Sequence, residues 1–375
     1  AELKKASKGN EEMQQKFTQY ETDNARLQAE LQQTKINAEI KVKTDEINSL
    51  AEEIASLNKQ INVIELTGVT ANELRDQRTV LIDQLSAIVD VDVTETPIYD
   101  TYNPERFTGA HRCIVTIAAG QVLVDGSDYN GLECKARETT NKSYQSDVQG
   151  MYDIYWSNGA PFGMYNASMG GELAGLLQMR DGNNGEYFYG EFTDLKKDAQ
   201  GNALATIKVT ADYLLDMTKN TLPDSGTINI GNTLYKYSSW TFNSETGSYT
   251  FKIDKAENTS EVPYSKLHRE ASINQPVEYK GIPYYQEQLN EWVRLFAKAF
   301  NGILTQEGSS DVYGDPGRIL FTGNLAVDKQ LNFRHEGGIN GEITSSSDCY
   351  RMLTAANFGI NEDILENADR LATHT

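Results

Sequence analysis

The first 66 residues constrain this chain more than any other feature, because they contain no proline and only one glycine, Gly9. Apolar side chains recur there at alternating steps of three and four residues, the spacing of a coiled-coil seam or a long helical bundle. The pattern changes register partway, which resembles a stutter in a coiled coil. The first register comprises Met13, Phe17, Tyr20, Asn24, Leu27, Leu31, Thr34 and Ala38. The second comprises Ile36, Ile40, Ile47, Leu50, Ile54, Leu57, Ile61 and Ile64.

We therefore predict one continuous helix over residues 1–66. About 60 residues at roughly 1.5 Å each would extend for about 90 Å, far beyond a helix of a globular domain. A solvated amphipathic helix in an ordinary bundle is the alternative that this spacing leaves open.

A glycine at position 68 ends this helix, and a second helix is expected directly after it. Thr70 and Glu73 fit a capping box, in which each side chain bonds the backbone amide of the other. Val69 and Leu74 stand at the positions of a hydrophobic staple. The second helix continues to about residue 89, so the two helices form an antiparallel hairpin.

The apolar period changes to two near residue 91, which is typical of β-strands. We expect two β-rich blocks, over residues 92–168 and 182–279, with a short helix near 170–181 between them. In the second block, Gly231-Asn232 predicts a two-residue hairpin, and residues 243–247 connect another.

Helix is expected to return at Pro283, which suits the first turn of a helix. Its predicted buried stripe comprises Tyr285, Leu289, Trp292, Phe296 and Ala299. A glycine-rich loop is expected over residues 302–345. Asn361 is expected to cap a last helix, whose apolar face comprises Leu365, Ala368 and Ala372.

These elements predict an α+β multidomain fold. Residues 1–91 and 280–375 are expected to form one discontinuous, coiled-coil-like helical bundle, built from both chain ends. The β-rich domains 92–168 and 182–279 are inserted between the two halves of that bundle.

Charge and composition exclude several classes of protein. The chain has 34 basic and 54 acidic side chains and a net charge of −20. A chain this acidic lacks the basic face that binds nucleic acid or an anionic membrane surface. No apolar run reaches the roughly 18 residues of a membrane span, and the start of the sequence lacks the apolar core of a signal peptide. We expect neither nucleic-acid nor membrane partners.

Motifs for catalysis, cofactors or metals are absent or incomplete. Cys113, Cys134 and Cys349 are too few for a disulfide framework or a zinc module. His111 and Cys113 form at most half of a metal site, and a pair of strand residues is the preferred interpretation. The segment 125–131 has a calcium-like composition, but its acids miss the spacing of a calcium loop, so a plain turn is preferred. Asp90 and Asp92 are a weak glycosidase pair. We predict no catalytic residue, no cofactor and no metal.

Aromatic residues are concentrated in the second β-rich block, at Tyr235, Tyr237, Trp240, Phe242, Tyr249 and Phe251. They could form a carbohydrate-binding platform, which would make the protein a surface adhesin. Cross-strand aromatics more often pack a β core, and that interpretation is preferred.

The order of the segments resembles the FlgK family, the first hook-associated proteins of the bacterial flagellum. The segment Asn72-Glu73-Leu74-Arg75-Asp76-Gln77-Arg78 carries the most specific part of this resemblance. The other segments, in chain order, are 57–61, 123–127, 170–177, Arg180-Asp181, 281–285, 299–301, 354–357 and Leu371-Ala372. Residues 182–278 match none of the family's segments and look like an insertion.

The resemblance implies a structural, non-enzymatic subunit at the junction of hook and filament. It implies export without a cleaved signal peptide to an extracellular flagellum. Its partners would be the hook protein, a second junction protein similar to FlgL, further copies in a ring, and an export chaperone that binds a C-terminal segment. The family's terminal assembly segments are not recognised here, so we expect this chain to be a core fragment.

The resembling segments also supply the candidate structural or interface residues, which are Asn72, Asp76, Arg78, Gly170, Gly171 and Asn301. Asp76 and Arg78 are two apart on a helix and cannot face each other. Each is expected to bond a neighbouring helix or the adjacent β domain; a contact between subunits is the alternative. An adhesin, and an enzyme hidden in the insertion, are the other functions considered.

Overall fold

The computed structural model describes residues 2–118, 120–138, 142–165, 169–326, 329–336 and 341–373, with side chains from Glu30 onward. Five members of the first helical register lie outside the described side chains: Met13, Phe17, Tyr20, Asn24 and Leu27. The chain divides into two compact units. Unit 1 comprises residues 1–32, 138–149 and 183–375, and unit 2 comprises residues 33–137 and 150–182.

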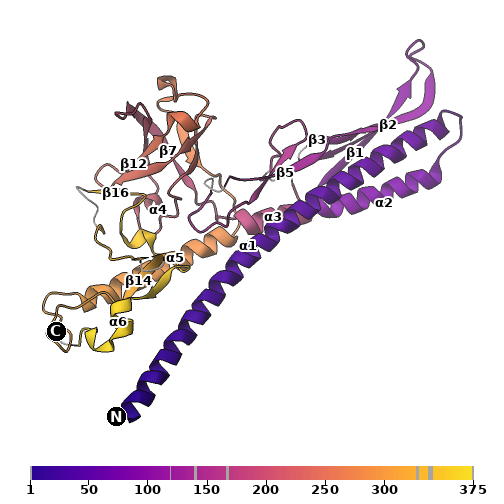
Figure 1. The fold of residues 1–375 in the computed structure, drawn as a ribbon. Coiled ribbons are helices and arrows are strands. Elements are labelled where there is room, and N and C mark those ends of the chain that lie inside the picture. The colour runs from indigo at the N-terminus through magenta and orange to yellow at the C-terminus, as the bar shows by residue number, and fades with distance from the viewer. Residues whose placement is uncertain are drawn as a thin grey trace. The chain divides into compact units, whose positions relative to one another are not determined.

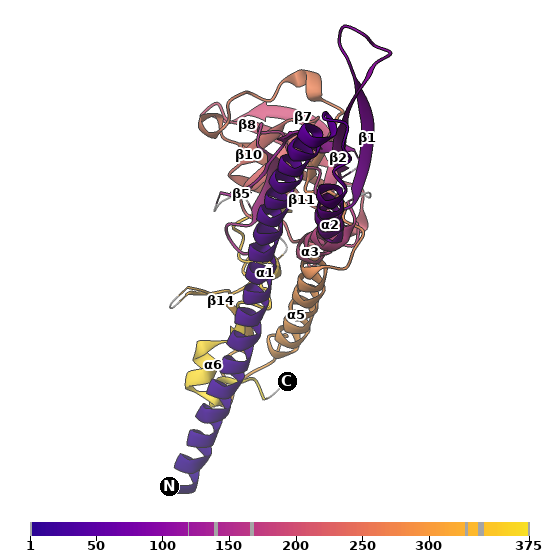
Figure 2. The ribbon, with the colours of Figure 1, turned by 90° about the vertical axis from the view of Figure 1, so that its right-hand side faces the viewer.

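The predicted long helix is confirmed: α1 runs without a break from Glu2 to Glu65 (Figures 1 and 2). In unit 2, its second register faces the core, because Ile36, Ile40, Ile47, Leu50, Ile54 and Ile61 are buried. The last member, Ile64, is exposed near the end of the helix. Leu31, Thr34 and Ala38, from the first register, are exposed.

The helical hairpin is confirmed as well. α2 (Asn72–Ile88) runs beside α1 (Figure 1), and α3 (Gly171–Asp181) is the short helix expected near 170–181. The predicted capping box is wrong, because the N-cap of α2 is Ala71 and no side chain caps it in the usual way. The carboxylate of Glu65 lies 3.4 Å from the Ala71 amide and supplies the missing acceptor.

Antiparallel strands complete unit 2. One sheet has the order β1-β2-β3-β4, and β5 pairs with β6. The bounds are β1 (Val91–Tyr99), β2 (Phe107–Ile117), β3 (Gln121–Asp125), β4 (Asp128–Tyr129), β5 (Leu132–Ala136) and β6 (Tyr152–Trp156). His111 and Cys113 are strand residues of β2, and segment 125–131 turns from β3 into β4, as the preferred interpretations predicted.

Unit 1 contains an eight-stranded antiparallel sheet of order β10-β9-β13-β7-β8-β12-β11-β16. Its strands are β7 (Phe188–Lys197), β8 (Ala203–Lys208), β9 (Gly226–Ile230), β10 (Leu234–Tyr237), β11 (Ser239–Asn243), β12 (Ser248–Ile253), β13 (Glu270–Ile273) and β16 (Glu342–Thr344). Short helices lie between them: α4 (Asp212–Leu215), η1 (Lys255–Glu257) and η2 (Tyr264–Lys266). Both predicted hairpins are present, and Gly231 and Asn232 have the positive φ that a tight hairpin turn requires.

The aromatic residues of this sheet form its core, which confirms the preferred interpretation. Tyr235, Tyr237, Trp240, Phe242, Tyr249 and Phe251 are each at most 2% exposed. Tyr249 is surrounded by rings, with centroids 4.6 Å from Phe242 and 5.2 Å from Phe188. Buried rings cannot stack on a sugar, so a platform built from these residues is excluded.

The helix α5 (Ile282–Leu304) begins with proline in its first turn, as predicted, but the predicted buried face is wrong. Tyr285, Leu289 and Trp292 are 62%, 51% and 59% exposed. The buried face instead carries Glu287, Asn290, Arg294 and Asn301. Asn290, Arg294 and Asn301 bond backbone and side-chain partners across unit 1, and those bonds determine which face of the helix turns inward.

The C-terminal part of unit 1 has more strand than expected. The predicted loop 302–345 contains β14 (Phe321–Ala326), β15 (Lys329–Gln330) and β16, and β14 also pairs with β17 (Phe358–Ile360). Asn361 caps α6 (Glu362–Glu366) as predicted, with its side chain accepting from the Asp363 amide. This helix is shorter than expected, because Asn367 breaks it and caps the next turn. The remaining helical turns are η3 (Tyr350–Met352) and η4 (Ala368–Arg370).

Candidate functional site

Glu65, the last residue of α1, holds a cluster of charged side chains at the tip of the helical hairpin. Arg75 of α2 donates to both oxygens of the Glu65 carboxylate, at 2.6 and 2.8 Å. This bidentate ion pair lowers the pKa of Glu65 to about 2, against the opposing effect of burial. The same guanidinium donates to Glu95 of β1 at 3.0 Å. The cluster therefore fixes α1, α2 and β1 together.

Arg78 extends this cluster. It is 8% exposed, and it donates to Asn58 Oδ1 of α1 at 2.8 Å and to Glu95 of β1 at 3.1 Å. Burial raises the pKa of Glu95, but Arg75 and Arg78 outweigh it, so the net pKa is lowered. Glu95 is therefore charged at neutral pH and accepts hydrogen bonds from both arginines.

Asn72 and Asp76 differ from Arg78, because both lie on the exposed side of α2. The bond expected from Asp76 to a neighbouring element is not found. The side chain of Asp76 has no hydrogen bond or ion pair with any of the described residues. The first turns of α2 thus combine a buried structural arginine with an exposed, unpaired carboxylate.

Gly170 and Gly171 lie where α3 begins against the end of α2. A side chain at Gly170 would collide with the Asp90 carboxylate. A Cβ at Gly171, whose φ is +75°, would lie 2.6 Å from the Ile88 carbonyl oxygen. Gly171 requires glycine because of its positive φ and the close backbone, whereas the Asp90 side chain can rotate away from a Cβ at Gly170.

Arg180 is fully buried and joins α3 to α1 through a polar cluster. It pairs with Asp181 at 2.7 Å and donates to Asn37 Oδ1 at 3.1 Å and to the Tyr152 carbonyl at 2.7 Å. Tyr165 donates its hydroxyl to Asp181 at 2.8 Å. The Arg180-Asp181 pair, noted in the sequence only for its resemblance, is therefore a packing element of unit 2.

A row of asparagines on α1 was missed by sequence reasoning. Asn37, Asn48, Asn58 and Asn62 share one face of the helix, and each bonds backbone groups of the strand region. Asn48 donates to the Leu132 carbonyl at 2.8 Å and accepts from the Leu132 amide at 2.7 Å. In the sequence, Asn37, Asn48 and Asn58 are spaced by eleven and ten residues, which places them on one face of the helix. This spacing was the signal that sequence reasoning could have used.

Asn301 lies at the buried end of α5 in unit 1. Its side chain donates to the Phe321 carbonyl at 2.8 Å and to the Tyr350 hydroxyl at 3.0 Å. It accepts from the amides of Leu320 and Phe321, both at 2.9 Å. All of its hydrogen-bonding capacity is thus used within unit 1.

Two buried arginines, also missed, tie distant segments of unit 1 together. Arg294 of α5 is fully buried and donates to five oxygens: Leu353 O, Arg351 O, Thr218 O, Asn220 O and Gln145 Oε1. Arg351 lies 4.5 Å from the ring centroid of Trp240 and donates to Asp224 at 2.9 Å. The signal in the sequence was the polar series 287, 290, 294 and 301 on α5, which has the same helical period as the apolar stripe.

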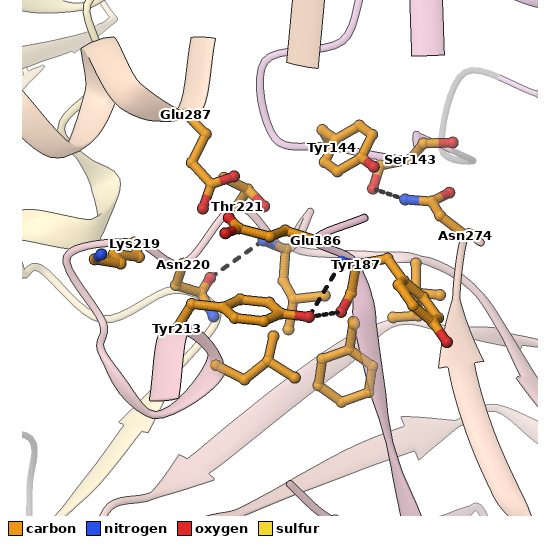
Figure 3. Close-up of a pocket in the computed structure, with 14 residues that line it drawn as sticks. Ser143, Tyr144, Glu186, Tyr187, Tyr213, Lys219, Asn220, Thr221, Asn274 and Glu287 are labelled. Carbon is orange, nitrogen blue, oxygen red and sulfur yellow. Dashed lines mark hydrogen bonds between the residues drawn. The ribbon is translucent and has the colours of Figure 1, made fainter. Parts of the chain in front are cut away.

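Unit 1 also contains a hollow of about 390 Å³, a volume that includes open solvent (Figure 3). Its lining comes from residues 143–144, 186–188, 213–214, 219–222 and 273–274, and from Glu287. Burial, together with the nearby carboxylates of Glu186 and Glu291, raises the pKa of Glu287 to about 7. Sequence reasoning gave no indication of Glu287.

Within the described ranges, no group of three or more histidine, cysteine or acidic residues could hold a metal ion. No helix formed by the described residues is long and apolar enough to cross a bilayer.

A family model described as the flagellar hook-associated protein FlgK helical domain matches residues 10–191. Flagellar hook-associated protein 1 of Bacillus subtilis (strain 168) is 44% identical over 62 residues, which are 16% of this chain and 12% of that protein. The Salmonella typhimurium protein of the same name is 32% identical over 159 residues, 40% of this chain and 24% of that protein.

A solved structure, the flagellar hook junction protein FlgK from Burkholderia pseudomallei, aligns with a TM-score of 0.36 at 17% identity, covering 70% of this chain and 50% of that one. The chain spans a quarter or less of the length of the curated relatives. Over residues 10–191 this chain matches the FlgK helical domain, and the curated relatives that it resembles are named flagellar hook-associated protein 1.

Proposed function

We propose that this chain is part of a non-enzymatic structural subunit at the junction between flagellar hook and filament. The match of residues 10–191 to the FlgK helical domain carries this proposal. The subunit is exported without a cleaved signal peptide and works outside the cell. Its partners are the hook protein, a second junction protein similar to FlgL, further copies in a ring, and an export chaperone.

The domain division proposed is a discontinuous helical domain, residues 1–91 and 280–375, with β-rich domains 92–168 and 182–279 inserted. Two exposed apolar stripes support a bundle built from both chain ends. One is the stripe of α5, and the other is the first register of α1, whose described members Leu31, Thr34 and Ala38 are exposed. Both have coiled-coil spacing, so the N-terminal part of α1 is the proposed cover of α5.

Quenching of tryptophan fluorescence tests this bundle. Trp292 is 59% exposed in the α5 stripe, whereas Trp240 and Trp156 are buried at 1% and 5% exposure. If residues 1–30 cover α5, acrylamide quenches Trp292 weakly in the full chain and strongly after deletion of those residues. Equal quenching of both proteins rejects the packing. A Trp292→Phe variant shows which part of the fluorescence comes from Trp292.

We assign the exposed side of α2, with Asn72 and Asp76, to a contact with a neighbouring subunit. The supporting observation is that Asp76 is exposed and unpaired among the described residues, next to a rigid cluster that fixes the helix. Asp76→Lys in the full-length gene is expected to leave the thermal midpoint unchanged and to impair filament formation. Gln77→Lys, also exposed but about 100° around the helix, is the control. Normal filaments with Asp76→Lys reject the contact.

The function itself is tested by deleting the gene in the bacterium that carries it. The expected phenotype, by electron microscopy, is hooks without filaments, with flagellin shed into the medium and rescue by the full-length gene. Normal filaments on motile cells would contradict the proposal.

A further inference from the structure

The hollow of Figure 3 lies within unit 1 and contains a buried carboxylate that lacks a partner. Glu287 is 7% exposed, and its side chain extends from α5 toward the hollow (Figure 3). It forms no hydrogen bond or ion pair with any described residue. A buried carboxyl group without a donor is costly, so such a position implies either a proton or a cation as its partner.

The charged groups around Glu287 leave the hollow negative. Glu186 lines it and has no ion pair among the described residues. Lys219 also lines it, but its ammonium lies 3.5 Å from Glu291 Oε1. Arg294 directs its guanidinium donors to five other oxygens. Neither cation therefore neutralises Glu287 through a direct contact.

Three tyrosines complete the lining: Tyr144, Tyr187 and Tyr213. Tyr213 is fixed in place, because its hydroxyl donates to the Tyr187 carbonyl at 2.7 Å and accepts from the Tyr187 amide at 3.2 Å. Aromatic faces beside carboxylates attract organic cations, because the ring quadrupole and the negative charge act in the same direction.

We propose that this hollow binds an organic cation, the ammonium or guanidinium group that ends a lysine or arginine side chain of another polypeptide. Glu287 and Glu186 supply the charge, and the tyrosines contact the apolar stem. This site does not depend on the function proposed above.

Small probes test the charge requirement directly. Nα-acetyl-L-arginine amide and Nα-acetyl-L-lysine amide are titrated into the whole chain at pH 8, with binding followed by NMR shifts of the unit 1 resonances. The matched control is Nα-acetyl-L-citrulline amide, which has nearly the shape of the arginine probe without its charge. Binding of the cationic probes, at least tenfold tighter than citrulline, is expected. Equal binding of arginine and citrulline probes, or no binding of either cation, overturns the site.

Two variants locate the binding. Glu287→Gln keeps the shape and is expected to weaken the arginine probe at least tenfold, and Glu186→Gln is expected to weaken it less. Glu278→Gln, an exposed carboxylate outside the lining, is the control for net charge and is expected to have no effect. Near-UV circular dichroism checks that each variant is folded. Unchanged affinity in Glu287→Gln overturns the proposal.

The pH dependence gives an independent readout. Glu287 has a pKa of about 7, so the affinity for the arginine probe is expected to rise between pH 5.5 and pH 8. The other charged or titratable groups that face it are Glu186, Glu291, Lys219, Arg294, Tyr144, Tyr187 and Tyr213. The rise must disappear in Glu287→Gln; its persistence there assigns the binding to another group and overturns the assignment. Putrescine, tested alongside, distinguishes a free amine from a side chain: much tighter putrescine binding contradicts a polypeptide source.

Discussion

Two buried carboxyl groups, Glu65 and Glu287, have surroundings that move their pKa in opposite directions. Glu65 is paired with a bidentate arginine, and its pKa falls to about 2. Glu287 is buried without a donor, and its pKa rises to about 7. At neutral and higher pH, the ionised Glu65 therefore stabilises the folded state, whereas the ionised Glu287 destabilises it.

The ion pair of Glu65 stabilises unit 2 above the ordinary pKa of 4.5 and is lost as the pH falls toward about 2. Glu65→Gln is expected to reduce the free energy of unfolding by about 2–3 kcal/mol at pH 7 and by little at pH 2.5. Urea unfolding at both pH values measures this difference. An equal loss at the two pH values would mean that packing, and not the charge, is responsible.

The opposite sign applies to Glu287, whose pKa is raised, so the native state loses stability as the pH rises from 4.5 to about 7. Glu287→Gln is expected to raise the free energy of unfolding at pH 8 by about 1–3 kcal/mol and to change it little at pH 4. Urea unfolding, with Glu278→Gln as the control, checks this. A less stable variant at pH 8 would show that the carboxylate has a stabilising partner.

Arg78 is expected to be structural whether or not α2 also contacts other subunits. Arg78→Ala removes two bonds and leaves Asn58 Oδ1 without this donor, so a loss of about 1–3 kcal/mol is expected. Thermal unfolding of the chain measures it. An unchanged midpoint combined with failed assembly would assign Arg78 to an interface instead.

At the scale of elements, α5 shows the limit of helical periodicity. The spacing of its apolar residues predicted a helix and its start at Pro283, because both depend on local sequence. It could not show which face is buried, because that depends on acceptors far away in the chain. Arg294 and Asn301 bond residues within 320–353. Those bonds turn the polar face of α5 inward and leave its apolar stripe exposed.

The same distinction applies to the candidate residues. The hairpins, the start of α5 at Pro283 and the aromatic core follow from short-range patterns and were predictable. The capping box failed because Glu65, six residues before Ala71, supplies the acceptor. Glu287 could not be found from the sequence, since its raised pKa comes from the burial that the fold imposes and from the nearby Glu186.

The asparagine row of α1 gives a prediction for the helix as a whole. Asn48→Ala leaves both backbone groups of Leu132 without these partners, so a loss of about 1–3 kcal/mol in unit 2 is expected. Ser49→Ala, at an exposed neighbouring position, is the control and is expected to change stability by less than about 0.5 kcal/mol. Urea unfolding compares the two. Equal effects would show that helix propensity, and not the row, is being measured.

At the scale of the whole molecule, unit 2 is built from residues 33–137 and 150–182, whereas unit 1 is built from three separate segments of the chain. Unit 2 has its own buried helix face and sheets, within residues 33–182. A fragment of residues 33–182, with 138–149 replaced by a glycine–serine linker, is expected to be helical and to unfold cooperatively by circular dichroism. A fragment without a cooperative transition would show that unit 2 needs the rest of the chain.

The positions of the five oxygens that surround Arg294 also determine when this side chain can be buried as the chain emerges. A chain that emerges N-terminus first, from a ribosome or through a narrow conduit, has every residue of unit 2 once Gly182 has appeared. The last of its acceptors along the chain, the Leu353 carbonyl, is present only after residue 353 has emerged. During that interval the guanidinium stays in water, and α5 cannot turn its polar face inward. A chain that ends before residue 353 therefore lacks one of the acceptors that Arg294 has in the folded protein.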